Sequence, residues 1–255
     1  MKTVSRISIT PVKCLRLSHP GRVLLGPDGV AENRRFFLVG PDGQRLRSSL
    51  TGWGLVVTAE YDAGDELLRM RFPDGRVVEG SAVAGGAAID TAAKGDRPLT
   101  GRVVPGPWEE QLSRLAGHPV RVVRPDRPGA TLVEPVTLVS DGSLERLARE
   151  AGVPEVDARR FRMLFELAGC AAHEEDGWDA ERFRIGEAVI RVGGPVDRCA
   201  MTTRDPETGE RDLDTLRLIK SYRGQREGDG AVLFGVYATV EQPGQVRLGD
   251  RLEPL

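Results

Sequence analysis

Cys199 is the residue of this sequence whose neighbours most favour chemistry. It follows a Gly-Gly-Pro break at residues 193–195, stands next to Arg198, and precedes Thr202 and Thr203. An adjacent guanidinium and the backbone amides of a turn favour the thiolate over the thiol, and the thiolate is the form that ligates a soft metal or attacks an electrophile. A free cysteine is, however, more often a small buried hydrophobic residue. From its neighbours alone, Cys199 is a candidate metal ligand or nucleophile.

No standard nucleotide or hydrolase motif accompanies Cys199. The sequence has no Gly-x-x-x-x-Gly-Lys-Ser/Thr loop, no glycine-rich turn that opens a helix within a βαβ unit, and no Gly-x-Ser-x-Gly elbow. His173 begins a His-Glu-Glu-Asp run, but no second histidine or cysteine stands at helical spacing from it. Because zinc sites need several convergent ligands, this run is interpreted as a solvated acidic loop.

The composition is that of an ordinary globular chain. The 255 residues are 40% hydrophobic and 29% charged, so disorder is excluded as the main state. A net charge of −2 gives no general attraction to nucleic acid or anionic lipid, and no apolar run approaches the roughly 20 residues that span a bilayer. Three cysteines without a CxxC pair, and an N-terminus without an apolar signal core, predict a cytoplasmic protein with no nucleic-acid or membrane partner.

Short strands must position Cys199 and its neighbours. The patterns predict strands over residues 4–9, 36–39, 55–59, 67–72, 76–79, 120–123, 136–139, 161–167, 183–192, 232–240 and 245–252. Helices are predicted over residues 108–116, over 143–151 with Ser143 as the N-cap, and within 212–220. Short strands at this spacing favour a barrel or sandwich over a βαβ array. The predicted fold class is therefore mainly β with a few helices (α+β), in two connected halves.

The stretch around Cys199 resembles a known family. Residues 160–212, which contain RFRMLFELAGC, HEEDGWD and PVDRCAMTTRDPETGERD, resemble the MOSC domain, named from the C-terminus of molybdenum-cofactor sulfurases. The likeness continues through 214–222 (DTLRLIKSY) and 233–252. Within the family the pattern is most similar to that of the amidoxime-reducing components, molybdenum enzymes that reduce N-hydroxylated compounds.

The other end of the chain resembles the companion domain of this family. The sequences ISITPVKCL at residues 7–15 and NRRFFLV at 33–39 are similar to the β-barrel domain that precedes MOSC domains. The resemblance implies a MOSC-type β-barrel over residues 108–255, preceded by a smaller N-terminal β-barrel-like domain over residues 1–95.

The resemblance also implies a set of site residues. The Cys199 thiolate would be the catalytic residue and the molybdenum ligand. Lys13, one of only four lysines, would face the cofactor phosphate, and Arg35 would contact phosphate or pterin oxygen with its guanidinium fork. The full set of implied cofactor-binding residues is Lys13, Cys14, Arg35, Arg162, Arg198 and Tyr237.

Several positions depart from the family pattern. Cys14 stands where the family has a serine, so a phosphate-binding hydroxyl is replaced by a weak donor. Met163 and Leu164 stand where the family has Pro-Asn, which removes an amide that would contact the cofactor. Only the second cysteine of the family's Cys-x-Arg-Cys element is present, as Cys199. The family resemblance therefore does not fix the identity of the substrate.

The implied function is that of a molybdenum-cofactor (Mo-molybdopterin) oxidoreductase, independent of pyridoxal phosphate, that reduces N-hydroxylated or related heteroatom–oxygen small molecules. Because the chain has no flavin motif and no cysteine cluster for iron–sulfur ligation, a separate electron-donor protein of flavin, iron–sulfur or haem type is implied. Two alternatives stay open: a sulfur transferase with a persulfide on Cys199, and a non-catalytic carrier of the molybdenum cofactor.

Overall fold

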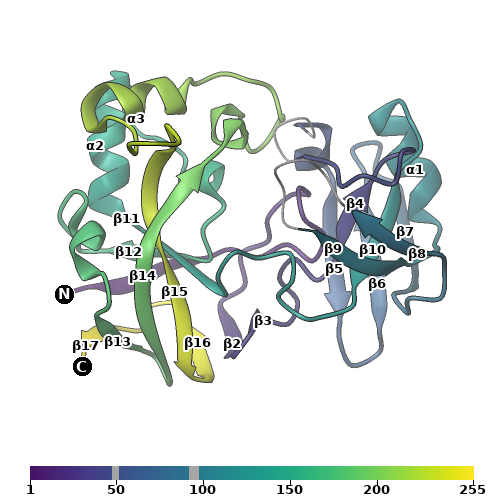
Figure 1. Cartoon of the computed structure of the whole chain (residues 1–255), viewed down its shortest axis with the longest axis horizontal. Coiled ribbons are helices and arrows are strands. Elements are labelled where there is room, and N and C mark those ends of the chain that lie inside the picture. The colour runs from purple at the N-terminus through teal and green to yellow at the C-terminus, as the bar shows by residue number, and fades with distance from the viewer. Residues whose placement is uncertain (48–51, 92–97) are drawn as a thin grey trace.

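A seven-stranded sheet forms one half of the molecule in this computed structural model, which describes residues 1–47, 52–91 and 98–255. From edge to edge its strands are β1 (Thr3–Ile7), β12 (Phe165–Ala168), β11 (Val136–Ser140), β15 (Val232–Gln242), β14 (Ala188–Arg198), β13 (Arg182–Ile185) and β17 (Leu252–Pro254). Neighbouring strands are antiparallel except for β11 and β12, which are parallel. A bridge between Thr3 and Arg251 joins the two edges, so the sheet curls into a nearly closed barrel (Figure 1).

Alternating apolar side chains fill this barrel. Along β14, Ala188, Ile190 and Val192 belong to the buried core, whereas Arg191 between them is exposed. Successive side chains of a strand point to opposite faces, so this period of two turns one face of the strand inward. Phe165 of β12 lies in the same core and is fully buried. A side chain of this size contributes about 1.5–3 kcal/mol when it leaves water, so burial of the barrel face drives its closure.

Two smaller sheets form the other half. The first contains β4 (Phe37–Val39), β10 (Arg121–Pro125), β9 (Leu99–Val103) and β8 (Ala88–Thr91), and the second contains β5 (Thr58–Asp62), β6 (Leu67–Arg71) and β7 (Val77–Ser81). Helix α1 (Trp108–Ala116) packs Trp108 and Leu112 into their shared core. The predicted strand over 55–59 begins only at Thr58, because Gly52–Val56 forms the 3₁₀ helix η2.

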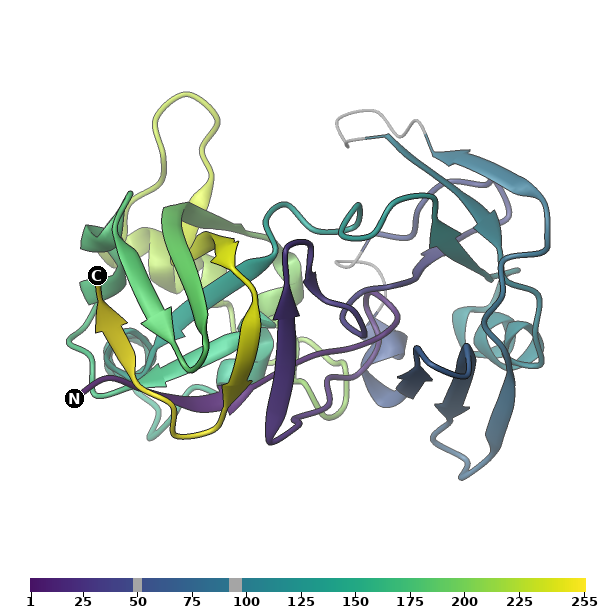
Figure 2. The ribbon, with the colours of Figure 1, turned by 90° about the horizontal axis from the view of Figure 1, so that it is seen from below.

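A third small sheet lies between the two halves. It contains β16 (Gly244–Arg247), β2 (Arg22–Gly26) and β3 (Gly29–Val30), with β2 in the middle (Figure 2). Strands β1 and β2, from the first thirty residues, thus pair with strands from the second half of the chain. The division into domains over 1–95 and 108–255 stays a prediction. The predicted fold class, mainly β with a few helices, is confirmed.

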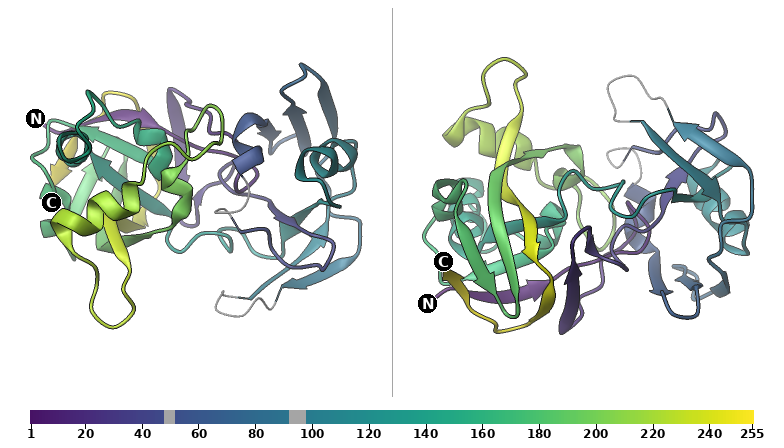
Figure 3. Two further views of the ribbon diagram at one scale, coloured as in Figure 1. Left: turned by 90° about the horizontal axis from the view of Figure 1, so that it is seen from above. Right: turned by 60° about the horizontal axis from the view of Figure 1, so that its bottom comes forward.

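Two helices lie side by side on the barrel. They are α2 (Asp141–Ala151) and α3 (Thr215–Arg223) (Figure 3). The chain caps α2 with Ser140, whose hydroxyl accepts the Ser143 N–H at 3.2 Å, so the prediction of Ser143 as the N-cap is wrong. Ser140 ends β11 with an extended backbone, which is the conformation that an N-cap requires. Within the described residues no helix is long and apolar enough to cross a membrane.

The predicted acidic loop after His173 is not fully solvated. Residues Glu174–Trp178 form the 3₁₀ helix η4, and Glu175 within it is fully buried. Its carboxylate accepts hydrogen bonds from the Ser140 hydroxyl at 2.6 Å and the Ser143 hydroxyl at 2.7 Å. A carboxylate at a helix N-terminus interacts favourably with the helix dipole. Glu175 therefore holds η4 against the first turn of α2, a structural role that its sequence context did not reveal.

Glu166 on β12 makes stability depend on pH. Only 8% of this residue is exposed, and burial is the main cause that raises its pKa from 4.5 to about 7, against the opposing effect of Arg6 at 3.4 Å. A carboxyl group that binds its proton more tightly in the folded state loses folding free energy as pH rises from the unfolded to the folded pKa. We therefore expect the Glu166→Gln variant to gain about 1–3 kcal/mol relative to the parent between pH 5 and pH 8.

Urea unfolding of both proteins at pH 5 and pH 8 measures this difference. Glu145→Gln provides the control, because the Glu145 side chain is 70% exposed on α2 and ends 4.0 Å from Arg149. Equal pH dependence in the parent and in Glu166→Gln would show that Glu166 titrates normally in the folded protein.

Candidate functional site

Cys199 lies where β14 ends and the chain turns into the 3₁₀ helix η5 (Ala200–Thr203). The cysteine is exposed, and it is the N-terminal neighbour of η5, with an extended backbone. Its carbonyl accepts the Thr202 N–H and the Thr202 hydroxyl, each at 3.1 Å. These bonds fix the backbone at this position, so the thiol is presented from a constrained strand end.

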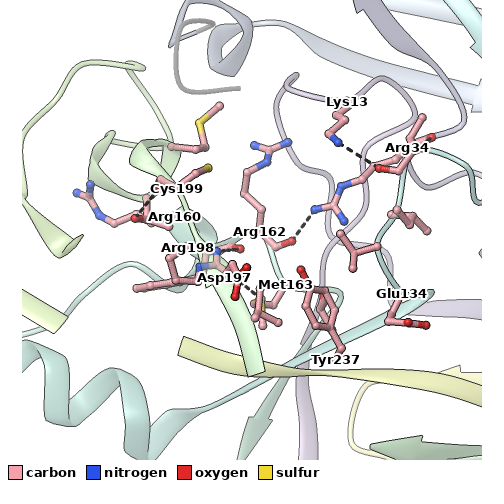
Figure 4. Close-up of a pocket in the computed structure, with 18 of the residues that line it drawn as sticks. Lys13, Arg34, Glu134, Arg160, Arg162, Met163, Asp197, Arg198, Cys199 and Tyr237 are labelled. Carbon is pink, nitrogen blue, oxygen red and sulfur yellow. Dashed lines mark hydrogen bonds between the residues drawn. The ribbon is translucent and has the colours of Figure 1, made fainter. Parts of the chain in front are cut away.

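A pocket opens beside Cys199, and five other segments line it together with the segment that contains Cys199 (Figure 4). The loop after β1 contributes Lys13 and Cys14. The segment that leads into β4 contributes Arg34. The segment between β10 and β11, the loop after the 3₁₀ helix η3 (Ala158–Phe161), and β15 supply most of the remaining wall. From these three segments the lining includes Thr131, Leu132, Val133, Glu134, Arg162, Met163 and Tyr237.

Arg198 is clamped next to the cysteine. One terminal N–H donates to the Phe161 carbonyl, the other to the Met163 sulfur at 3.2 Å, and the guanidinium lies 5.2 Å from the centre of the Phe161 ring. Its Nε is buried and has no hydrogen-bond partner among the described residues. Burial lowers the pKa of Arg198 to about 10, opposed mainly by Cys199. An unsatisfied charged donor beside a thiol is a position where an anionic ligand would be stabilised.

Arg34 and Arg162 form a second cationic pair in the pocket. Arg162 donates to the Leu15 carbonyl at 2.5 Å, and Arg34 donates to the Arg162 carbonyl at 2.8 Å. Burial lowers the pKa of both, and for Arg162, with its neighbour Arg34, the pKa falls to about 10. In the described ranges no carboxylate forms an ion pair with Arg34, Arg162 or Arg198. The pocket thus gathers positive charge that the protein itself leaves uncompensated.

The other predicted residues flank these arginines. The Lys13 ammonium donates to the Thr131 carbonyl at 3.1 Å. Cys14 is 3% exposed and has a φ of 80°, in the left-handed region that non-glycine residues seldom adopt. Tyr237 faces the pocket from β15, and burial raises its pKa, so its phenol is protonated at neutral pH.

The structure brings six of the seven predicted site residues to one pocket, and Arg35 is the exception. Arg35 lines a different cavity, while Arg34 takes its place beside Arg162. Arg34 has a φ of 52°, in the left-handed region, so the chain turns at this residue and the two neighbouring arginines enter different cavities. Arg34 and Thr131 are the residues that sequence reasoning missed. For Arg34 the Arg-Arg pair was a visible signal, but its orientation depends on the pairing of residues 33–36 with residues 10–13.

Among the described residues of this pocket, Cys199 supplies the exposed thiol that could ligate a metal. Among the residues that the structure describes, no group of three or more His, Cys, Asp or Glu residues could hold a metal ion. A single exposed thiol with cationic neighbours suits a soft metal that arrives with its other ligands on an anionic carrier. The Cys199 thiol, the neighbouring guanidinium groups and the buried Arg198 Nε, which has no partner among the described residues, fit an anionic metal-bearing group.

The fold and the pocket define a MOSC-domain protein. The chain belongs to the MOSC domain family, whose model matches residues 113–253. It is similar to mitochondrial amidoxime-reducing component 1 of Homo sapiens, with 27% identity over 281 residues that cover 97% of this chain and 81% of that protein. It is also 35% identical over 122 residues to mitochondrial amidoxime reducing component 2 of Bos taurus, where the match covers 46% of this chain.

Two further likenesses extend this comparison. Molybdenum cofactor sulfurase of Caenorhabditis briggsae is 25% identical over 264 residues, which cover 96% of this chain and 35% of that protein. The matched segment likewise spans 35% of the bovine protein. Among solved structures, the YuaD protein from Bacillus subtilis aligns over 100% of this chain and 96% of its own, with 12% identity and a TM-score of 0.45.

These names overturn one prediction from the sequence. The absence of a disulfide framework and of an apolar N-terminal run predicted a cytoplasmic location. The amidoxime-reducing relatives from cattle, mouse and human are named mitochondrial proteins, which contradicts that prediction. Free cysteines are typical of proteins in reducing compartments, but they do not distinguish one reducing compartment from another.

Proposed function

We propose that this chain binds a molybdenum cofactor in the Cys199 pocket and reduces N-hydroxylated or related heteroatom–oxygen small molecules. The observation that carries the proposal is one exposed thiol among three arginines that no described carboxylate neutralises. A thiolate is a soft metal ligand, and unpaired guanidinium groups bind phosphate and pterin oxygens. The names of the amidoxime-reducing relatives support the same class of substrate.

The chain's own residues have distinct tasks in this proposal. Cys199 ligates the metal, while Lys13, Arg34, Arg162 and Arg198 hold the anionic part of the cofactor. When bound, the cofactor supplies the two electrons that cleave the N–O bond. The overall change consumes two electrons and two protons, and it releases water and the N–H product. Tyr237 keeps its phenolic proton at neutral pH and faces the pocket, so it can donate one of those protons.

The electrons must come from a second protein. A reductase of this kind turns over only when its metal is reduced again after each cycle. We therefore include a separate electron-donor protein, of flavin, iron–sulfur or haem type, in the proposal.

Cofactor content is the first measurement. Protein from a host that makes molybdenum cofactor should contain about one molybdenum per chain and release a fluorescent pterin on denaturation. It should also reduce an amidoxime with a chemical electron donor. Protein with neither molybdenum nor pterin would refute the proposal, and bound cofactor without turnover would indicate a carrier.

A sulfur transferase is the second candidate, because Cys199 is exposed and one relative is named a molybdenum cofactor sulfurase. In that case the Cys199 thiolate would carry a persulfide, which the same guanidinium groups would stabilise. Cyanide-labile sulfur on Cys199 in molybdenum-free protein would favour this candidate over the reductase.

A further inference from the structure

A second cavity lies on the other side of the Arg34–Arg35 pair. It is bounded by the turn between β2 and β3, by β5 and the start of β6, by Arg124 of β10, and by Pro128 and Gly129. It therefore sits where the third small sheet, which contains β2, meets the half built from the two smaller sheets (Figure 2). The cavity encloses about 340 Å³, whereas one water takes about 30 Å³. A small ion fits in it together with several waters.

Arg35 is the unexplained group in this cavity. Its guanidinium makes no hydrogen bond or ion pair with the described part of the chain, and its Nη1 is buried without a partner. Buried donors are almost always satisfied, and a charged donor that is not costs free energy. The arrangement is therefore incomplete in the protein alone, and a ligand acceptor would complete it.

Two arginines, Arg35 and Arg124, and two carboxylates, Asp28 and Glu66, line the cavity. Glu66 is already paired with Arg124 at 2.7 Å, and it also accepts from the Tyr61 hydroxyl at 3.5 Å. Asp28 lies at the rim and is exposed. The Glu66–Arg124 pair cancels, and no described carboxylate forms an ion pair with Arg35, so the Arg35 guanidinium is available to a ligand. An anion with at least two oxygens matches a guanidinium fork.

We propose that this cavity binds a small oxyanion, a carboxylate or a phosphate, through Arg35, at a site separate from the Cys199 pocket. The segment 127–135 borders both cavities, this one through Pro128 and Gly129 and the Cys199 pocket through residues 131–134. The oxyanion would contact the β2–β3 turn of the third small sheet and residues of β5 and β10 in the half built from the two smaller sheets. Its binding would therefore stabilise their packing.

Nuclear magnetic resonance titration with inorganic phosphate, and separately with acetate, tests this site. The amide signals of Gly29, Asn33, Tyr61 and Gly129 should shift with a dissociation constant in the millimolar range. The response to phosphate alone would identify a phosphate site, and a response to both would identify a general oxyanion site. Shifts confined to residues around Cys199 would overturn the proposal.

Arg35→Gln should weaken binding at these signals at least tenfold. Arg102→Gln is the matched control, because Arg102 is exposed on β9 and lines neither cavity. Arg35→Lys keeps the charge but not the two-pronged guanidinium, so it should bind phosphate several-fold more weakly than the parent. This variant also tests the site if Arg35→Gln fails to fold. Parent-like affinity in Arg35→Gln would overturn the proposal. Molybdenum content should stay unchanged in Arg35→Gln, so this site and the proposed function can fail independently.

Discussion

Replacing Cys199 with alanine should abolish amidoxime reduction and molybdenum retention together, while the melting temperature stays within about 2 °C of the parent. Cys199 is the exposed cysteine among the described residues that line the pocket, and it stands beside Arg198 at the end of β14. Loss of a group that merely supports a metal ligand lowers activity about 10- to 100-fold, so loss of the ligand itself should cost at least about 100-fold. Because Cys199 is exposed, the shorter side chain opens no cavity in the core.

Cys170→Ala is the matched control for this experiment. Cys170 precedes η4, outside the pocket, and burial raises the pKa of its thiol to about 12, so it carries no thiolate at neutral pH. This variant should keep both molybdenum and activity. If Cys199→Ala still reduced an amidoxime with a chemical electron donor, the assignment of Cys199 as metal ligand would be wrong.

The local sequence predicts the parts of this molecule that depend on neighbours along the chain. The helix over 108–116 is found at those residues, because its apolar period and the Gly117 end signal are local. The strands predicted over 67–72 and 76–79 are likewise found, as the paired strands β6 and β7. The shift of the α2 cap from Ser143 to Ser140 arises because the N-terminal boundary of a helix depends on where the preceding strand ends.

Part of the candidate site cannot be predicted from local sequence. Cys199 and Arg198 are adjacent, so their chemistry is visible in the sequence. Thr131 and Arg34 reach the pocket from other segments, and only tertiary pairing sets which way they point. Thr131 donates to the Arg34 carbonyl at 2.5 Å, a contact between residues 97 positions apart. Patterns within a short window carry no information on that contact.

Arg162→Gln should reduce cofactor retention about tenfold to a hundredfold. A hydrogen bond to a charged group is worth about 1.5–3 kcal/mol, and glutamine removes the charge while it keeps a donor. The pKa of Arg162 is lowered to about 10, so the guanidinium is still charged at neutral pH and its charge is lost in the variant at every working pH. Molybdenum per chain after gel filtration, and the rate of pterin release, measure retention without reference to activity.

A structural effect of the same substitution can be separated from loss of charge. Arg162 also donates to the Leu15 carbonyl, so Arg162→Gln should lower the melting temperature slightly. Arg162→Lys keeps the charge, and it should retain more cofactor than Arg162→Gln if the attraction to an anion is what matters. Arg191→Gln removes an exposed arginine that pairs with Glu241 on the outside of the barrel, and it should leave retention unchanged. Equal retention in the glutamine variant and the parent would mean that the cationic pocket does not hold the cofactor, and the case for molybdenum chemistry would then rest on Cys199 alone.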